Sequence, residues 1–245
     1  MARKKSDRLP ISMSRKFILT DDTQFAIKEA YKTARTNLVF ALAASEKKLV
    51  VVTSCAPSEG KSTNCLNMAI TMAETGASVL LIDSDMRKPV QHSLLRLDNK
   101  VGLSSVLGGI VRDISKAINR NVRTHLDVLT SGPIPPNPAE LIQGTIMDQL
   151  LELASKHYDY VFIDTPPATV VTDALLYNSR TAGIVFVVKE GHTTHAEINE
   201  ALEKVKLSNG KVLGFLKVNC SGKGGKGGYH SYKYKYNYYK YKAYE

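Results

Sequence analysis

The chain has 245 residues, which suits one α/β domain with extensions. Hydrophobic residues make up 43% and charged residues 23%, which excludes wholesale disorder, a collagen-like chain and a disulfide scaffold. No apolar run approaches the roughly 18 residues that a membrane-spanning helix needs, and the basic start leads into no signal peptide. The sequence therefore predicts a cytoplasmic protein, or one held at the membrane by something else. Three cysteines without a CxxC spacing are predicted to be free thiols: Cys55, Cys65 and Cys220.

The net charge of +10 is located at the two ends of the chain. Residues 1–20 hold six Lys or Arg against Asp7, and residues 222–245 hold six against Glu245, so each end carries +5. Residues 21–221 are consequently neutral. The basicity therefore indicates docking to an anionic lipid, polyanion or nucleic acid, and says nothing about the chemistry of the central domain.

Short apolar runs rich in β-branched residues alternate with segments of helical period, which is a βαβ rhythm. A helix is expected before the first strand, and a rigid proline-rich loop is expected just before residue 138. The near-continuous apolar strands are typical of a mostly parallel, twisted sheet with helices on both faces. The expected strands are 49–53, 78–82, 126–129, 160–163, 184–188 and 212–218, and the expected helices are 21–44, 61–75, 138–156, 173–179 and 196–208.

Composition divides the chain into three regions. A basic N-terminal segment covers residues 1–20, and the α/β domain covers residues 21–221. The tail, residues 222–245, is dominated by Gly, Lys, Ser and Tyr, and Ala243 is its only aliphatic residue. Because the tail has no core-forming residues, it is predicted to be flexible.

The first expected strand runs into the sequence SCAPSEGKST at 54–63, a strand–loop–helix junction. Backbone N–H groups of such a loop hold phosphate oxygens, so the junction predicts a P-loop for ATP. In it, Lys61 would reach the β and γ phosphates and the Ser62 hydroxyl would ligate Mg²⁺. Cys55 replaces the first glycine of the usual motif, and a helix that merely begins with glycine is the alternative. The expected ATP contacts are Ala56, Pro57, Ser58, Glu59, Gly60, Lys61, Ser62 and Thr63.

Three carboxylates follow two other apolar strands. Asp83 and Asp85 come after the apolar run VLLI, and Asp164 comes after YVFI. Ligands bind at the carboxyl edge of parallel sheets, so the first two could converge on a Mg–nucleotide or an acceptor hydroxyl. Asp164 lies where a Walker B carboxylate binds Mg²⁺, often through water. The alternatives are a solvated turn with a local Asp–Arg pair and a capping Asp. Together with the P-loop, the pattern predicts nucleotide-dependent phosphoryl transfer.

From about residue 25 to its end, the chain resembles the bacterial tyrosine kinases (BY-kinases) of capsular and exopolysaccharide biosynthesis, in the form of a separate cytoplasmic subunit. The resemblance rests on the P-loop at 56–63, the Walker A′ sequence VLLIDSDMR, the Walker B sequence VFIDTPP, the segment SGPIPPNPAEL and the tyrosine-rich tail. It implies a P-loop kinase that autophosphorylates its tail in trans and regulates polysaccharide synthesis and export. The implied catalytic residues are Lys61, Asp83, Asp85 and Arg87, with Asp83 as the leading general base, and the implied metal ligands are Ser62, Asp83 and Asp164.

The family's oligomerisation motif, E-x-x-R-x-x-R, is present here as Glu29, Lys32 and Arg35, with lysine in place of the first arginine. On a helix these positions share a slanted face that can pair with a neighbour, although lysine lacks the bidentate fork of arginine. A solvated helix face is the alternative. The resemblance further implies a homo-oligomeric ring, a membrane-protein activator that recruits the kinase to the inner face of the membrane, and a protein-tyrosine phosphatase. No nucleic-acid partner is expected.

Eight of the 12 tyrosines lie in the last 17 residues. Interleaved with lysine, they could stack on single-stranded nucleic acid, and an alternating edge strand is a weaker alternative. Beside a phosphoryl-transfer site, we expect them to be substrates. They are Tyr229, Tyr232, Tyr234, Tyr236, Tyr238, Tyr239, Tyr241 and Tyr244.

Two alternative functions are compatible with the same nucleotide-binding motifs. One is a positioning or partitioning ATPase of the MinD/ParA type, but the deviant P-loop of those proteins carries a lysine where this chain has Ala56. The other is a non-catalytic, nucleotide-gated adaptor whose tail binds membrane or an anionic polymer. Retained ATP binding without turnover would favour the adaptor.

Overall fold

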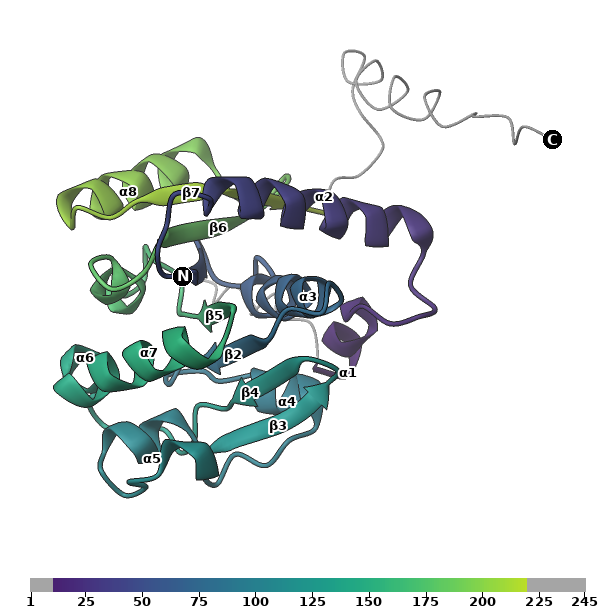
Figure 1. Ribbon diagram of the computed structural model, residues 1–245. Coiled ribbons are helices and arrows are strands. Elements are labelled where there is room, and N and C mark those ends of the chain that lie inside the picture. The colour runs from purple at the N-terminus through teal and green to yellow at the C-terminus, as the bar shows by residue number, and fades with distance from the viewer. Residues whose placement is uncertain (1–10, 220–245) are drawn as a thin grey trace, which may run out of the picture.

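A seven-stranded sheet forms the centre of the computed structural model, which describes residues 11–219 (Figure 1). The strand order is β3-β4-β2-β5-β1-β6-β7, and only β3 runs antiparallel to its neighbour. The predicted mostly parallel α/β fold is therefore confirmed. Within the described range, no helix has the length and apolar character needed to span a bilayer.

All six expected strands are present, with ends displaced by no more than one residue. The strands β1, β2, β4 and β5 are buried along almost their whole length, as a parallel sheet covered on both faces requires. Their bounds are β1 Leu49–Ser54, β2 Val79–Asp83, β4 Leu126–Leu129, β5 Tyr160–Asp164, β6 Gly183–Lys189 and β7 Val212–Val218.

The additional strand, β3 (Ile118–Arg123), was not expected from the sequence. It is a polar edge strand with a register shift, and Asn121 within it has a φ of 49°. The Arg120 guanidinium and the Asn121 N–H of β3 both donate hydrogen bonds to the Asp127 carboxylate of β4. Because these polar contacts replace an apolar alternation, the periodicity of the sequence does not reveal the strand.

Helices cover both faces of the sheet and form two hydrophobic cores (Figure 1). One face carries α2 (Phe25–Ala41), α3 (Lys61–Ala73) and α4 (Gln91–Leu95). The opposite face carries α5 (Leu103–Leu107), α6 (Pro138–Gln143), α7 (Thr145–His157) and α8 (His195–Leu207). Short helical turns complete the elements of residues 11–219: α1 (Ile11–Ser14), η1 (Arg15–Phe17), η2 (Ile114–Lys116) and η3 (Asp173–Tyr177).

Several helix predictions were wrong in detail. The single helix expected over 138–156 is two helices, because Gly144 has extended backbone angles (φ −69°, ψ 156°) between α6 and α7. The helix expected over 21–44 begins only at Phe25, and the one expected over 173–179 is the 3₁₀ turn η3. The five-residue helices α4 and α5 are too short to produce a recognisable helical period.

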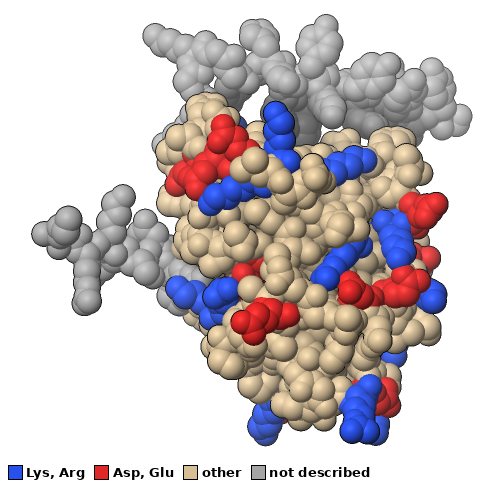
Figure 2. All heavy atoms as spheres, turned by 90° about the vertical axis from the view of Figure 1, so that its left-hand side faces the viewer, with Lys and Arg blue, Asp and Glu red and all other residues tan. Residues whose placement is uncertain are grey.

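The surface that bears α6, α7 and α8 carries basic and acidic side chains interspersed with one another (Figure 2). No broad field of one sign dominates this view, which agrees with the neutral net charge of residues 21–221. Long-range attraction of a polyanion therefore has no basis on this face.

The sheet order brings the three predicted motifs to one edge. Strand β5 lies between β2 and β1, and Asp164 is in register with Asp83 on one side and with Val52 on the other. Because β1, β2 and β5 are parallel, their carboxyl ends meet at the same edge, where open α/β folds bind ligands.

Candidate active site

The P-loop connects β1 to α3 and turns through two residues of positive φ. These are Ser58 at 67° and Gly60 at 84°, and Gly60 caps the start of α3. A side chain at Gly60 would be strained by this φ and would approach Asn64 Nδ2 to 3.2 Å. The loop sequence thus gives the local conformation that leads directly into the first turn of α3.

Glu59 fixes this loop from inside. It is 1% exposed, and its carboxylate accepts hydrogen bonds from the Ala56 N–H at 2.9 Å and from the hydroxyl of Thr193. Thr193 lies between β6 and α8, so a distant segment holds the P-loop in place. Sequence analysis gave Glu59 only as an ATP contact and missed this structural tie.

Lys61 lies at the centre of a buried charge cluster, which we define as Lys61, Ser62, Asp83, Asp85 and Asp164. Its Nζ is 2.8 Å from Asp85 Oδ2, 3.4 Å from Asp164 Oδ1 and 3.0 Å from Ser62 Oγ. All five residues are at most 8% exposed. The structure thus brings the predicted phosphate, metal and carboxylate residues together, although they come from three separate segments of the chain.

Asp83 lies at the end of β2 in register with Asp164, and its carboxylate is held by backbone groups. Its Oδ1 accepts from Asp85 N at 3.3 Å, and its Oδ2 accepts from Val90 N at 3.3 Å and Gln91 N at 3.0 Å. An ionised carboxylate has about four acceptor sites, so one lone-pair direction is left for another donor.

The pKa values of the cluster reflect burial and mutual repulsion. Burial and the charge of Asp164 raise the pKa of Asp83, and burial likewise raises that of Asp164. For Lys61, burial acts to lower the pKa, but the carboxylates of Asp164 and Asp85 outweigh it and raise the pKa. The ammonium of Lys61 is therefore the positive charge that faces the Asp85 and Asp164 carboxyl groups and opposes their desolvation.

The donor set fits Mg²⁺ and a nucleotide. Within residues 11–219, no trio of His, Cys, Asp or Glu side chains is arranged to hold a metal ion alone. A Mg²⁺ ion needs no such cage, because it binds through one or two carboxylates together with waters and substrate phosphates. Ser62, Asp83 and Asp164 can supply the protein oxygens at this edge.

Arg87, predicted with the catalytic group, lies outside the charge cluster. Its guanidinium makes two hydrogen bonds to Asp173 of η3, at 2.8 and 3.0 Å. Asp173 is 1% exposed and was missed by sequence analysis, because 86 residues separate the two partners. The adjacent Ser84 hydroxyl is hydrogen-bonded to Tyr177 of the same turn, so η3 holds the loop after β2 at two points.

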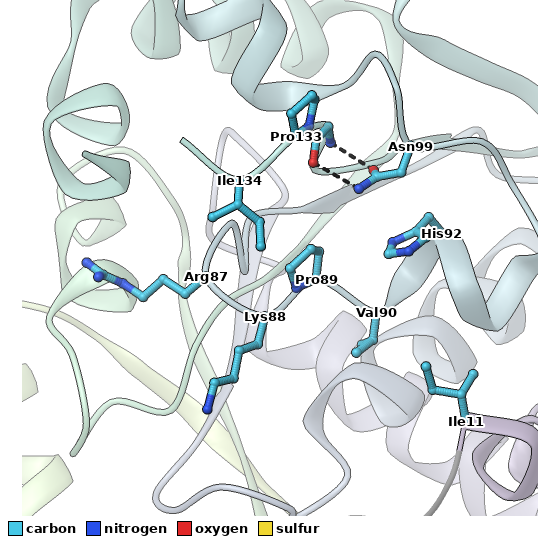
Figure 3. A pocket seen from close by; sticks show the side chains of 10 residues that line it. Ile11, Arg87, Lys88, Pro89, Val90, His92, Asn99, Pro133 and Ile134 are labelled. Atoms are coloured by element: carbon cyan, nitrogen blue, oxygen red, sulfur yellow. Dashed lines mark hydrogen bonds between the residues drawn. The ribbon is translucent and has the colours of Figure 1, made fainter. Parts of the chain in front are cut away.

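A surface pocket of about 640 Å³ lies beside this loop (Figure 3). Pro89, Val90 and Ile134 supply apolar walls, while the amide of Asn99 holds the backbone of Gly132 through two hydrogen bonds. In Figure 3 the Arg87 side chain points away from the His92 side of the pocket. No member of the charge cluster lines it.

The structure separates the three residues of the predicted oligomerisation motif. Lys32 and Glu29 form an exposed ion pair of 2.7 Å on α2. Arg35 instead donates to the Thr71 carbonyl of α3 at 2.7 Å, a contact within the subunit. Their role in assembly stays a prediction, and the structure adds a packing role for Arg35.

All eight predicted phosphorylation sites lie outside the described residues, as does Cys220. Of the four remaining tyrosines, three hydroxyls are hydrogen-bonded to side chains of the domain. The fourth tyrosine packs under a lysine ammonium, 5.0 Å from the ring centroid. The three hydrogen-bonded tyrosines are Tyr31, Tyr158 and Tyr177, and the fourth is Tyr160.

Comparisons with known proteins agree with this geometry. Residues 47–212 match the family model described as AAA domain. The tyrosine-protein kinase YwqD of Bacillus subtilis is 41% identical over 83% of this chain and 86% of its own length. The putative tyrosine-protein kinase CapB of Staphylococcus aureus is 36% identical over 87% of this chain and 91% of its own length.

Two solved structures resemble this chain to different degrees. The kinase domain of Escherichia coli tyrosine kinase ETK is 30% identical, with a TM-score of 0.78 over 88% of this chain and 82% of that one. A plasmid partition protein from Borrelia burgdorferi covers 70% of this chain and 78% of its own at 23% identity and a TM-score of 0.56. The second likeness is one of fold alone.

Proposed function

The chain belongs to the bacterial tyrosine-protein kinases, within the AAA-domain family, and we propose that it transfers the γ-phosphoryl group of ATP to tyrosines of its own C-terminal tail. Phosphorylation in trans between subunits would then regulate the synthesis and export of a capsular polysaccharide or exopolysaccharide. The observation that carries the proposal is the buried charge cluster directly beneath the P-loop.

ATP binding is assigned to the P-loop. Backbone N–H groups of residues 56–63 would hold the phosphate oxygens, and Lys61 would offset the charge of the γ-phosphate. In the structure the Lys61 ammonium contacts Asp85 and Asp164, so phosphate competes with these carboxylates for it. Binding of ATP therefore draws away part of the positive charge that offsets the aspartates of the cluster.

The Mg²⁺ site is assigned to Ser62, Asp83 and Asp164. When bound, the ion would neutralise charge on the phosphates during transfer. Loss of Lys61 to the phosphates leaves the carboxylates of the cluster less compensated, and a divalent cation restores the balance. This supports a coupled uptake of ATP and Mg²⁺.

Asp83 is our general base for the tyrosine hydroxyl. A phenol has an ordinary pKa near 10, so its attack on phosphorus benefits from a nearby proton acceptor. Without bound metal, burial and the charge of Asp164 raise the pKa of Asp83, which makes its carboxylate a stronger base than an exposed aspartate. Asp85 would position Lys61, and Arg87 would hold the loop through Asp173.

The tail supplies the proposed acceptors. It begins after β7, whose carboxyl end lies at the same edge of the sheet as the cluster. The tail carries +5, and eight phosphates of about −1.5 to −2 each would bring it to about −7 to −11. The phosphorylated tail would then be repelled by Asp83, Asp85 and Asp164, which would release it and loosen a ring.

The test is incubation with labelled ATP and Mg²⁺, followed by mapping of the phosphorylated residues. Label on tyrosines of the tail is expected, and a variant with all eight tail tyrosines changed to phenylalanine should lose it. Label confined to Tyr31, Tyr158, Tyr160 or Tyr177 would refute the tail as substrate. Binding and slow hydrolysis without any phosphotyrosine would indicate a positioning ATPase, and binding without turnover would indicate an adaptor.

Partners follow from the same proposal. We expect a homo-oligomeric ring, a membrane-protein activator that brings the chain to the inner face of the cell membrane, and a phosphatase that resets the tail. Repeating the labelling reaction with an activator's cytoplasmic segment tests the second of these. An increase in tail phosphorylation is expected if that segment docks on the kinase.

A further inference from the structure

Gln91, the first residue of α4, connects all three nucleotide motifs, although no sequence motif includes it. Its side-chain Nε2 donates to the Ser62 carbonyl and to Asp164 Oδ2, both at 2.9 Å. Its backbone N–H donates to Asp83 Oδ2 at 3.0 Å. One fully buried residue therefore contacts the P-loop helix, the end of β2 and the end of β5.

The second polar atom of this side chain has no partner. Gln91 Oε1 is buried and accepts no hydrogen bond from the described residues. The amide cannot be turned to relieve this, because both neighbours of Nε2 are acceptor oxygens that require an N–H donor. A buried, unpaired acceptor is costly, and this one belongs to a side chain that contacts Asp164, where a donor that arrives with the ligand can pair with it.

We propose that Gln91 is a positioning residue for the Mg–nucleotide complex, an inference that rests on the proposed kinase function. Its Nε2 orients the Asp164 carboxylate, and its free Oε1 accepts a hydrogen bond from a water that accompanies Mg²⁺. Magnesium retains several waters in protein sites, and the partners that orient its ligands control its affinity. Gln91 thus makes nucleotide binding dependent on the metal.

The first experiment measures binding of a non-hydrolysable ATP analogue to the whole chain, with Mg²⁺ titrated and with Mg²⁺ removed by a chelator. In Gln91→Met, the Mg²⁺ concentration that gives half-maximal enhancement should rise about 10- to 100-fold. Affinity for the metal-free nucleotide should stay within about twofold of wild type, because the P-loop itself is intact. Gln149→Met, the same change at an exposed position of α7, is the matched control and should change neither quantity.

An unchanged Mg²⁺ requirement in folded Gln91→Met would overturn the inference. An equal loss of affinity with and without Mg²⁺ would also overturn it, because it would indicate a purely structural role. If the methionine variant does not fold, Gln91→Asn keeps the amide but shortens its reach, and the same selective rise is expected. If wild type binds nucleotide without any response to Mg²⁺, the proposed metal site itself fails.

The second experiment needs no variant. The side-chain amide resonance of Gln91 in the wild-type chain should shift on addition of Mg²⁺ with the analogue, and much less with the analogue alone. Equal shifts under the two conditions would contradict a contact that depends on the metal.

Discussion

Two ion pairs of nearly the same length lie in very different parts of this molecule. Lys61 is 2.8 Å from Asp85 in the charge cluster, and Lys32 is 2.7 Å from Glu29 on α2. The side chains of the first pair are 10% and 3% exposed, whereas those of the second are 46% and 44% exposed. Burial, and not distance, therefore separates the two.

The difference has a physical consequence for function. Water and salt screen the exposed pair, which contributes about 0.3–0.5 kcal/mol to a helix. Charges in the cluster have lost their hydration and depend on one another, so removal of any one perturbs the rest. The cluster is suited to respond to a charged ligand, while the pair on α2 is exposed to solvent.

The largest effect is expected from Lys61→Met. Phosphate transfer should fall by at least about 100-fold, since the charge that offsets the γ-phosphate is lost. The free energy of unfolding should fall by about 3–5 kcal/mol, because Asp85 and Asp164 lose their buried partner. Label transfer and chemical denaturation measure the two effects.

Lys32→Met is the matched control for that prediction. It removes the same charge from an exposed pair, so its unfolding free energy should change by no more than about 0.5 kcal/mol. Similar losses of stability in both variants would refute the contrast between the two regions.

A smaller effect is expected from Arg87→Lys. Lysine keeps the charge but cannot make both hydrogen bonds to Asp173, so the loop after β2 would be held less firmly. We expect a loss of about 1.5–3 kcal/mol of unfolding free energy, with lower transfer and nearly normal ATP affinity. Denaturation, labelling and analogue binding check these in turn. A loss of ATP affinity as large as the loss of transfer would instead place Arg87 in the nucleotide site.

Sequence reasoning predicted the parts of this molecule that depend on local patterns. The buried strands are continuous apolar runs, and the P-loop and the two strand-end aspartate motifs are contiguous in the chain. Sheet order then brings Lys61, Asp85 and Asp164 into contact, as their places at strand ends indicated. The main β-sheet and the centre of the site were therefore predictable.

The missed features depend on contacts between distant segments. Gln91 reaches Asp164 across 73 residues, and Arg87 reaches Asp173 across 86. Polar contacts of this kind leave no periodic signal. Arg35 adds a contact of the same kind, because its guanidinium donates one hydrogen bond to the Thr71 carbonyl within the subunit, whereas the partner suggested by its motif stays a prediction.

That contact sharpens the prediction for assembly. Glu29→Ala/Lys32→Ala should lower the mass of the oligomer with a change of stability below about 1 kcal/mol, because the pair is exposed. Arg35→Ala should lower stability by about 1 kcal/mol even in a dilute monomer, because a hydrogen bond within the subunit is lost. Light scattering and thermal unfolding separate the two effects. Identical masses for wild type and a Glu29→Ala/Lys32→Ala/Arg35→Ala variant, at a concentration where wild type is oligomeric, would count against α2 as the assembly surface.

The smallest effect is expected at the two cysteines near the cluster, Cys55 and Cys65, both free and fully buried. Burial, with the negative charges of Glu59 and Glu197, raises the pKa of Cys55 to about 12. Burial also raises the pKa of Cys65, and Asp164 adds to the effect. At pH 8 only about one Cys55 in ten thousand is the reactive thiolate, so both thiols should resist iodoacetamide in the native protein. Peptide mass spectrometry after timed labelling measures this directly.

Labelling of the two thiols should begin only when the protein unfolds. It should therefore begin at an earlier time in Lys61→Met than in Lys32→Met. Rapid labelling of native wild type would mean that this region opens to water far more often than its burial implies.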